Sequence, residues 1–309
     1  MSSQPLTRVV TGADGVSREQ EFTNPPARQG GGRRRKPMQP IEGPSAFGGD
    51  RRRFMSLLWI TAVQDYRLMY RNSLLGYVWT LLRPLLFFAV LYLVFTRVIR
   101  FGNAVPDYAV LLLMNIMLFQ FFIDASSSAM GSVVRGEPLV RKMHFPRIVI
   151  PLANVITAFM TSLMNFVVVI GFFLASGVEP IATWLLLPVI MATLFVFSAS
   201  VAILLSTAYV WFRDLDHIWG VLTRVLFYTT PILFPLEFVP ESFRWIITLN
   251  PLTPILYEAR VLLVQPDAPS LTELVGVAPV IGSVIVGIGL LVGALSLFIR
   301  QAPRVAEAL

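Results

Sequence analysis

The sequence predicts an all-α membrane protein with six transmembrane helices, and two observations support this prediction. Of the 309 residues, 55% are hydrophobic and only 14% are charged, with a mean hydropathy of +0.69. A soluble fold with this balance would have too little polar surface to face water. The chain also contains six apolar stretches close to the roughly 20 residues that a helix needs to cross a bilayer.

The composition excludes several kinds of site. The chain has no cysteine, so disulfides, thiolate metal sites and a cysteine nucleophile are excluded. His144 and His217 are its only histidines, which removes histidine metal clusters and most acid–base designs. We therefore expect no catalytic residue, no metal and no cofactor in this chain.

Residues 1–49 are rich in Gly, Pro, Ser, Gln and Arg without apolar periodicity, so we expect a disordered cytoplasmic tail. Much of the net charge of +7 lies in the basic runs 33–36 and 51–53. Such runs beside an apolar segment are typical of contact with anionic lipid headgroups. A solvated charge run is the alternative, and the lack of interleaved aromatic residues argues against nucleic acid.

Residues 50–73 are predicted to form an amphipathic interface helix along the membrane surface. Apolar residues such as Leu58 and Val63 alternate there with Gln64, Asp65 and the basic side chains. The segment is too polar to cross a bilayer. Its basic interface candidates are Arg67 and Arg71.

The transmembrane domain is expected to cover residues 74–300. Its six spans are predicted at 74–101, 108–130, 148–176, 181–212, 218–236 and 275–299. Pro84 should kink the first span, because proline removes a backbone donor. The third and fourth spans exceed the bilayer thickness, so they should tilt or extend beyond the lipid.

The basic residues orient these spans. With both termini cytoplasmic, including a tail at 301–309, most of them fall on the inner side, as the positive-inside rule requires. These inner residues are Arg67, Arg71, Arg135, Arg141, Lys142, Arg147, Arg213, Arg300 and Arg304. Arg97 and Arg100 fall on the outer side, against the trend.

The largest inner loop is predicted to contain one short helix, because Pro138 suits a first helical turn and Pro146 prevents continuation. At 1.5 Å per residue this helix is about 10 Å long. It could dock into a groove on a partner, or the loop could simply obey the positive-inside rule. Its residues are Glu137, Pro138, Leu139, Val140, Arg141, Lys142, Met143, His144 and Phe145.

The outer segment between the fifth and sixth spans is divided by four prolines into pieces near 241–249 and 253–264, which are too short to span. Short helices entering the membrane from outside need surrounding protein or an aqueous cavity, which suggests an outer gate. Surface helices that only stabilise the fold are the alternative. The gate candidates are Glu241, Arg244, Asn250, Glu258 and Arg260.

The first and fifth spans carry the candidates for lining a pathway. Arg83 could attract a phosphate or pyrophosphate, because guanidinium offers a planar fork of donors, or it could pair with a carboxylate or reach an interface. Aromatic faces can slide along sugar C–H surfaces, although helix packing and interfacial belts also explain them. The aromatic candidates are Tyr77, Phe87, Phe88, Tyr92, Trp219, Phe227 and Tyr228.

Several motifs together resemble a known family. They are 70–79 (YRNSLLGYVW), 83–85 (RPL), 139–147 (LVRKMHFPR), 212–215 (FRDL), 231–232 (PI) and 250–252 (NPL). In this order, over about residues 51–300, they resemble the polysaccharide-exporting ABC-2 permeases of the Wzm and TagG type.

The resemblance implies a homodimer of permeases in the cytoplasmic membrane, bound to two copies of a separate ABC ATPase of the Wzt or TagH type that holds ATP and Mg²⁺. The interface helix and the loop helix, as a cytoplasmic coupling helix, would contact the ATPase. The first and fifth spans would line the conduit, and short re-entrant outer helices would gate it. The cargo would be a polyprenyl-pyrophosphate-linked polysaccharide of the O-antigen, galactan or teichoic acid class. The long basic tail and the Arg-, Ala- and Val-rich composition favour the galactan-lipid exporters of actinobacterial cell walls.

The chain contains no G-x-x-x-x-G-K-[ST] segment, so ATP would be hydrolysed on the partner and this subunit would not itself be an enzyme. One rival function is a stand-alone polyprenyl-glycolipid flippase or glycosyltransferase, but Asp65, Asp214 and Asp216 do not converge. Another is an ion-coupled transporter, but residues 54–176 and 181–299 show no repeat.

The coupling role of the loop helix gives a first prediction. Reversing the charge of Arg141 and Lys142 should abolish co-purification with the ATPase, because the basic face of the docking helix becomes acidic. Membrane insertion, measured by fractionation, should stay intact. Unchanged assembly and export would count against the coupling role.

Overall fold

The structure of the chain is a computed structural model. It describes residues 8–11, 17–20, 51–70, 74–136 and 146–308. The chain divides into two compact units, residues 1–42 and 43–309, which are treated separately below.

The N-terminal unit contains a two-stranded antiparallel ribbon. Strand β1 (Arg8–Thr11) pairs with β2 (Ser17–Gln20). The structure therefore differs from the disorder predicted for residues 1–49 at these eight positions, because Val9 and Val10 favour extended backbone. A ribbon of two strands is marginally stable in water. The remaining residues of the predicted tail lie outside the described residues.

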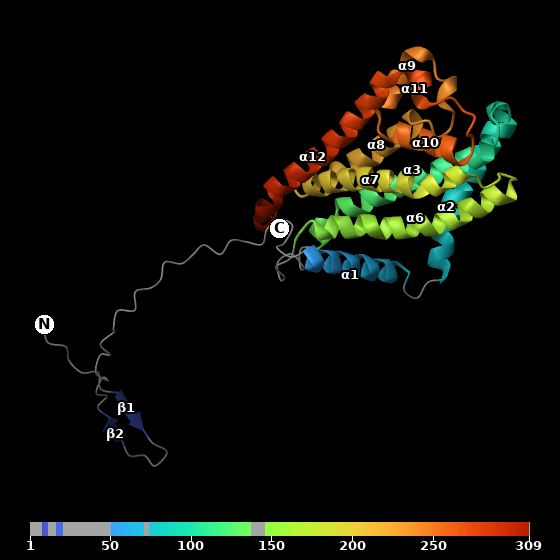
Figure 1. Ribbon diagram of the computed structural model, residues 1–309. Coiled ribbons are helices and arrows are strands. Elements are labelled where there is room, and N and C mark those ends of the chain that lie inside the picture. Colours follow the sequence, from blue (N-terminus) through green and yellow to red (C-terminus); the bar gives the residue numbers. More distant parts are fainter. Residues whose placement is uncertain (1–7, 12–16, 21–50, 71–73, 137–145, 309) are drawn as a thin grey trace. The chain divides into compact units, whose positions relative to one another are not determined.

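The second unit is helical (Figure 1). Its longer helices are α1 (Arg51–Met69), α2 (Leu74–Leu93), α3 (Tyr108–Met130), α6 (Val149–Ala175), α7 (Leu187–Tyr209), α8 (Leu215–Thr229), α9 (Glu241–Leu249), α10 (Leu252–Leu263) and α12 (Val277–Ala308). The shorter elements are η1 (Val94–Val98), η2 (Phe101–Ala104), α4 (Ser132–Arg135), η3 (Ala182–Leu186), η4 (Leu236–Phe238) and α11 (Leu271–Val275).

Among the described residues, five helices are long and apolar enough to cross a membrane. They are Val78–Val98, Tyr108–Met130, Val149–Ala175, Ala182–Tyr209 and Val277–Gln301. Their positions confirm five of the six predicted spans, so the chain is a multi-pass membrane protein.

The predicted fifth span, residues 218–236, is not among these helices. Helix α8 has 15 residues and ends at Thr229, which corresponds to about 22 Å, whereas a hydrocarbon core is about 30 Å thick. Thr230 has extended dihedrals (φ −87°, ψ 144°), as expected for a residue that precedes proline. Pro231 therefore ends the helix inside an apolar stretch that continues beyond it.

The predicted C-terminal tail, residues 301–309, continues α12, which ends at Ala308. Ala302, Arg304, Ala306 and Glu307 are good helix formers and favour this continuation, although Pro303 removes one backbone donor. The cytoplasmic location of the tail stays a prediction.

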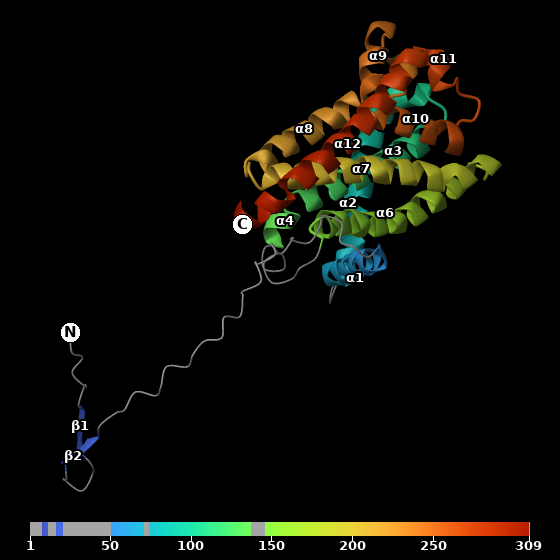
Figure 2. The ribbon, with the colours of Figure 1, turned by 60° about the vertical axis from the view of Figure 1, so that its left-hand side comes forward.

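Helix α3 lies at the centre of the helical unit. It packs against α6, α7, α2 and α8, and it lies alongside α6 and α7 in both views (Figures 1 and 2). Leu112, Leu113 and Leu118 are fully buried, and Phe119, Phe121 and Phe122 fill the space toward its neighbours. Each neighbouring helix turns an apolar face toward α3. Helix α3 therefore carries apolar side chains on every side that a neighbour covers.

Helix α1 confirms an amphipathic helix within the predicted range 50–73. It buries Leu58 and Ala62 against Val149 and Ala153 at the start of α6, and Thr157 donates to the Ala62 carbonyl at 3.1 Å. In Figure 2 α1 is strongly foreshortened while α6 remains extended, so the two axes cross. That α1 lies along the membrane surface stays a prediction.

Of the two interface candidates, Arg67 is exposed on α1. Arg71 lies outside the described residues. Burial raises the pKa of Asp65, on the same helix.

Candidate functional site

The non-helical segment that follows α8 is held by α3. Thr230, Ile232 and Leu233 are buried, so their carbonyls need protein partners. Asn115 Nδ2 lies 3.3 Å from the Pro231 carbonyl and 3.4 Å from that of Ile232, and donates to both. Tyr108 donates its hydroxyl to the Leu233 carbonyl at 2.9 Å. Two side chains of α3 thus replace the donors that a continuing helix would have supplied.

Asn250, one of the predicted gate residues, connects the same segment to the short outer helices. Its Nδ2 donates to Thr230 Oγ1 at 2.9 Å, and its Oδ1 accepts from the Leu252 amide at 3.1 Å. It therefore ties the end of α8 to the junction of α9 and α10. This geometry supports a role in stabilising the fold.

The predicted gate arginines are also held by protein groups. Arg260 forms an ion pair with Glu237, with Nη1 2.7 Å from Oε2 and 3.0 Å from Oε1. Arg244 donates to the carbonyls of Val239 and Glu237, at 2.8 Å each. Each guanidinium thus has partners within the chain, and the gate role of both residues stays a prediction.

Two further residues complete this arrangement. Gln265 accepts from Arg260 Nε at 2.7 Å and donates to the Pro106 carbonyl at 2.7 Å, which connects α10 to the segment before α3. Tyr257 donates to the Pro269 carbonyl at 2.6 Å and to Glu237 Oε1 at 3.3 Å. Burial, and then the Glu237 carboxylate, raise the pKa of Tyr257. We call Glu237, Arg244, Tyr257, Arg260 and Gln265 the outer polar cluster.

The outer helices α9 and α10 agree with the two short helices predicted for this segment. Glu241 is exposed on α9, and Glu258 is exposed on α10. The sequence reasoning did not single out Asn115, Glu237 or Tyr257 as candidates. Asn115 could have been found, because it is a polar residue in the middle of a span that is otherwise strongly apolar.

Two of the predicted pathway residues are buried inside the protomer. Trp219 packs against Phe122 of α3 with ring centroids 6.0 Å apart, and Phe227 packs against Phe119 at 5.5 Å. Trp219, Thr223 and Phe227 form the buried stripe of α8, at a spacing of four residues. In this structure the two aromatic residues anchor α8 to the core, and their role in lining a pathway stays a prediction.

The remaining aromatic candidates of α2 and α8 are more exposed. Tyr228 is 65% exposed, Phe87 44% and Tyr92 39%, and the rings of Phe87 and Phe227 lie 5.4 Å apart where α2 approaches α8. Phe88 is turned inward, stacked on Tyr92 and edge-on to Phe172 of α6. The side chain of Tyr77 lies outside the described residues.

The α2–α8 face can therefore be defined by its exposed large side chains. They are Val78, Trp79, Leu86, Phe87, Val90, Tyr92, Leu93, Ile218, Val221, Leu222, Val225 and Tyr228. Arg83 and Arg224 are the exposed cations on these two helices. Arg83 is attracted by Asp124 of α3, which accepts a hydrogen bond from Gln120 at 2.8 Å. Arg83 thus has an electrostatic partner within the protomer, as one of the sequence-based alternatives requires.

The predicted coupling helix, residues 137–145, lies outside the described residues, so its role stays a prediction. Its flanks are described: α4 ends at Arg135, which donates to the Ser128 carbonyl at 2.7 Å. On the other side, burial lowers the pKa of Arg147 just before α6.

Comparison with known proteins decides between the classes of membrane protein that this fold allows. Residues 56–264 match the family described as ABC-2 type transporter, which is more than half of the chain. The chain belongs to this family. The ABC-2 match covers α1 to α10, including the exposed α2–α8 face and the outer polar cluster.

The ABC-2 chain is also similar to curated proteins. Two from Klebsiella pneumoniae, each named O-antigen export system permease protein RfbA, are 33% identical over 205 residues, covering 66% of this chain and 78% of theirs. A protein of the same name from Myxococcus xanthus is 30% identical over 234 residues, covering 72% of this chain and 88% of its own. These matches support the resemblance on which the sequence analysis relied.

The break after α8 gives a second prediction. Asn115→Leu should lower the free energy of unfolding by about 1–3 kcal/mol, because the buried carbonyls of Pro231 and Ile232 lose their donor. Thermal unfolding of the purified chain in detergent measures this loss.

Asn154→Leu is the matched control. Asn154 is half-buried and donates to the Ile150 carbonyl of its own helix at 3.0 Å, a carbonyl that the α6 backbone can also satisfy. Its replacement should change stability by about 0.5 kcal/mol or less. Equal losses in the two variants would show that the Asn115 contact does not hold the break.

Proposed function

We propose that this chain is the permease subunit of an ATP-driven exporter that moves polyprenyl-pyrophosphate-linked polysaccharide across the cytoplasmic membrane. The proposal takes its cargo class from relatives that are named O-antigen export permeases. The structural observation that carries it is the α2–α8 face, where large aromatic and aliphatic side chains stand exposed beside Arg83 and Arg224.

The exposed arginines favour an α2–α8 face that borders a water-filled conduit over one that borders lipid. A charged side chain at the bilayer centre costs about 2.5–3.5 kcal/mol on insertion scales. Next to a water-filled path, the exposed Arg83 and Arg224 keep their hydration, and the neighbouring aromatic faces can contact sugar rings. A second copy of the permease, with its own α2–α8 face opposite the first, would close such a path. We therefore propose a homodimer.

In the proposed exporter, ATP is hydrolysed by a separate subunit. The chain has no phosphate-binding loop motif, so we propose that two copies of an ABC ATPase bind ATP and Mg²⁺ and hydrolyse the nucleotide. Residues 137–145 would dock on that ATPase as the coupling helix, with α1 beside them. Movement of these elements would shift the spans as rigid bodies and open the α2–α8 interface.

The topology follows from this arrangement. Helix α8, together with the extended segment that follows it, would make a sixth and shorter crossing, so that both termini lie in the cytoplasm, as the positive-inside count favours. The helices α9 and α10 then lie at the outer end of the path. Because the outer polar cluster ties them together, they would act as one gate unit.

A reconstitution experiment tests the function. The permease is placed in proteoliposomes with an ABC ATPase of the Wzt or TagH type, and the probe is a polyprenyl-pyrophosphate-linked O-polysaccharide or galactan. We expect the glycan to reach the opposite side only with both subunits, ATP and Mg²⁺, as read out with a lectin that cannot cross the membrane. Translocation by the permease alone, or hydrolysis of nucleotide by it, would refute the proposal.

The conduit gives a third prediction, which uses the absence of native cysteines. In the assembled transporter, Phe87→Cys and Tyr228→Cys should react with a water-soluble maleimide, because a thiol reacts as thiolate and needs water. Ile285→Cys is the control: Ile285 is 63% exposed but lies on α12, away from the α2–α8 face. Equal labelling at all three positions would contradict a conduit at this face.

A further inference from the structure

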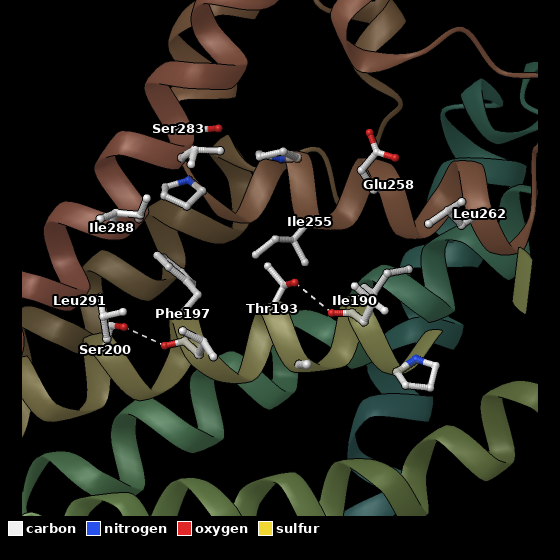
Figure 3. A pocket seen from close by; sticks show the side chains of 18 residues that line it. Ile190, Thr193, Phe197, Ser200, Ile255, Glu258, Leu262, Ser283, Ile288 and Leu291 are labelled. Atoms are coloured by element: carbon white, nitrogen blue, oxygen red, sulfur yellow. Dashed lines mark hydrogen bonds between the residues drawn. The ribbon is translucent and has the colours of Figure 1, made fainter. Parts of the chain in front are cut away.

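A groove of about 840 Å³ lies between α7, α10 and α12, and the proposed export path does not use it. Figure 3 shows the groove, with the α7 side chains below, those of α10 above and those of α12 to one side. Its walls are predominantly apolar. The main contacts that it offers come from Ile190, Phe197, Ile255, Leu262, Ile288 and Leu291.

The hydroxyl groups in the walls are already used. Thr193 donates to the Val189 carbonyl at 2.9 Å and Ser200 to the Val196 carbonyl at 2.7 Å, as the dashed lines in Figure 3 show. Ser283 donates to the carbonyl of Val280 at 2.7 Å. Each of these bonds stays within one helix. The walls therefore present no free hydroxyl donor to a ligand, and they suit hydrocarbon.

Glu258 is the charged residue among those that line the groove. In Figure 3 its carboxylate points away from Thr193 and Ile255, toward the edge of the groove. Within the described part of the chain, this carboxylate accepts no hydrogen bond and forms no ion pair. The side chain is exposed at the groove edge but partly covered by the wall, and this partial burial raises its pKa, which disfavours the charged form. A cation at this edge would supply that counter-charge.

The groove extends along part of α12 and is open on one side. Its α12 residues run from Ser283 to Leu291, which places them about 9–21 Å from the start of the helix at Val277. Val189 and Ile288, on facing helices, are 59% and 57% exposed. Hydrocarbon chains of the surrounding leaflet can therefore enter from the side. Glu258 lies at the edge of the groove, on α10.

We propose that this groove binds a membrane phospholipid whose headgroup carries an ammonium group, with one acyl chain between α7, α10 and α12 and the ammonium at Glu258. Charge complementarity selects this occupant. The pyrophosphate of the proposed cargo would be repelled by the carboxylate, whereas a zwitterionic amine lipid places its positive charge beside it. The bound lipid would brace α10, and with it the outer polar cluster, against two membrane spans.

Lipid binding can be measured without transport, so the test uses lipid binding alone. The full-length chain is purified and titrated with phosphatidylethanolamine or phosphatidylglycerol of identical acyl chains, and bound lipid is counted by native mass spectrometry. We expect about a tenfold preference for phosphatidylethanolamine, as one charge-assisted contact provides. Glu258→Gln should abolish this preference while the acyl chain still binds.

A pair of glycine variants tests the hydrocarbon part. A side chain at Gly287 would meet Pro251 at an ordinary contact distance of 3.8 Å, so Gly287→Leu fills the groove without a clash at its Cβ. Gly289 has no neighbour within 4 Å of an added Cβ, which makes Gly289→Leu the matched control. We expect Gly287→Leu to lower lipid occupancy at least fivefold and Gly289→Leu to leave it unchanged.

Three results would overturn the proposal. They are equal binding of the two lipids by the unmodified chain, a preference that survives in Glu258→Gln, and undiminished occupancy in a folded Gly287→Leu variant. A disulfide between two copies of a Val189→Cys variant would instead place a second copy over the groove. If Gly287→Leu does not fold, the Glu258→Gln comparison still decides, because that exposed side chain is replaced by a neutral one of similar shape.

Discussion

The architecture depends on how the chain satisfies the backbone carbonyls where α8 stops. Lipid supplies no hydrogen-bond donors, so a helix that ends inside an apolar region exposes groups whose burial is costly unless protein pairs with them. Helix α3 provides the donors through Asn115 and Tyr108. It can do so because its first half, Tyr108 to Phe119, is buried among neighbouring elements, which fixes both side chains in place. The central position of α3 and the interrupted crossing at Pro231 are therefore two aspects of one constraint.

The outer polar cluster extends this constraint to the rest of the outer end. Glu237 follows the interruption directly, and through Arg260 and Gln265 it connects α10 to the segment that precedes α3. Removing one partner of a partly buried ion pair leaves the other partner without its counter-charge. The chain between α8 and α12 is accordingly held by these polar contacts together with apolar packing around Leu236, Leu252 and Leu256.

The sequence predicted the helices well where the length of an apolar run alone sets the ends of a helix. Helix α3 occupies the predicted span, and α9 begins and ends at the predicted residues. It did not place the end of α8, because hydropathy continues through Pro231 while the helix does not. That Trp219 and Phe227 are covered by α3 is a contact that only the fold shows. The Glu237–Arg260 pair joins residues 23 positions apart, a contact that single-sequence patterns do not reveal.

Helix α8 is attached to the core by one side only, so substitutions on its other side need not change the stability of the chain. Trp219, Thr223 and Phe227 are its fully buried positions, and the opposite side of the helix contributes little to the core. Substitutions on that side leave the interior packing unchanged. In the proposed exporter, surface side chains on this side can therefore change with the cargo while the bundle that carries them keeps its packing.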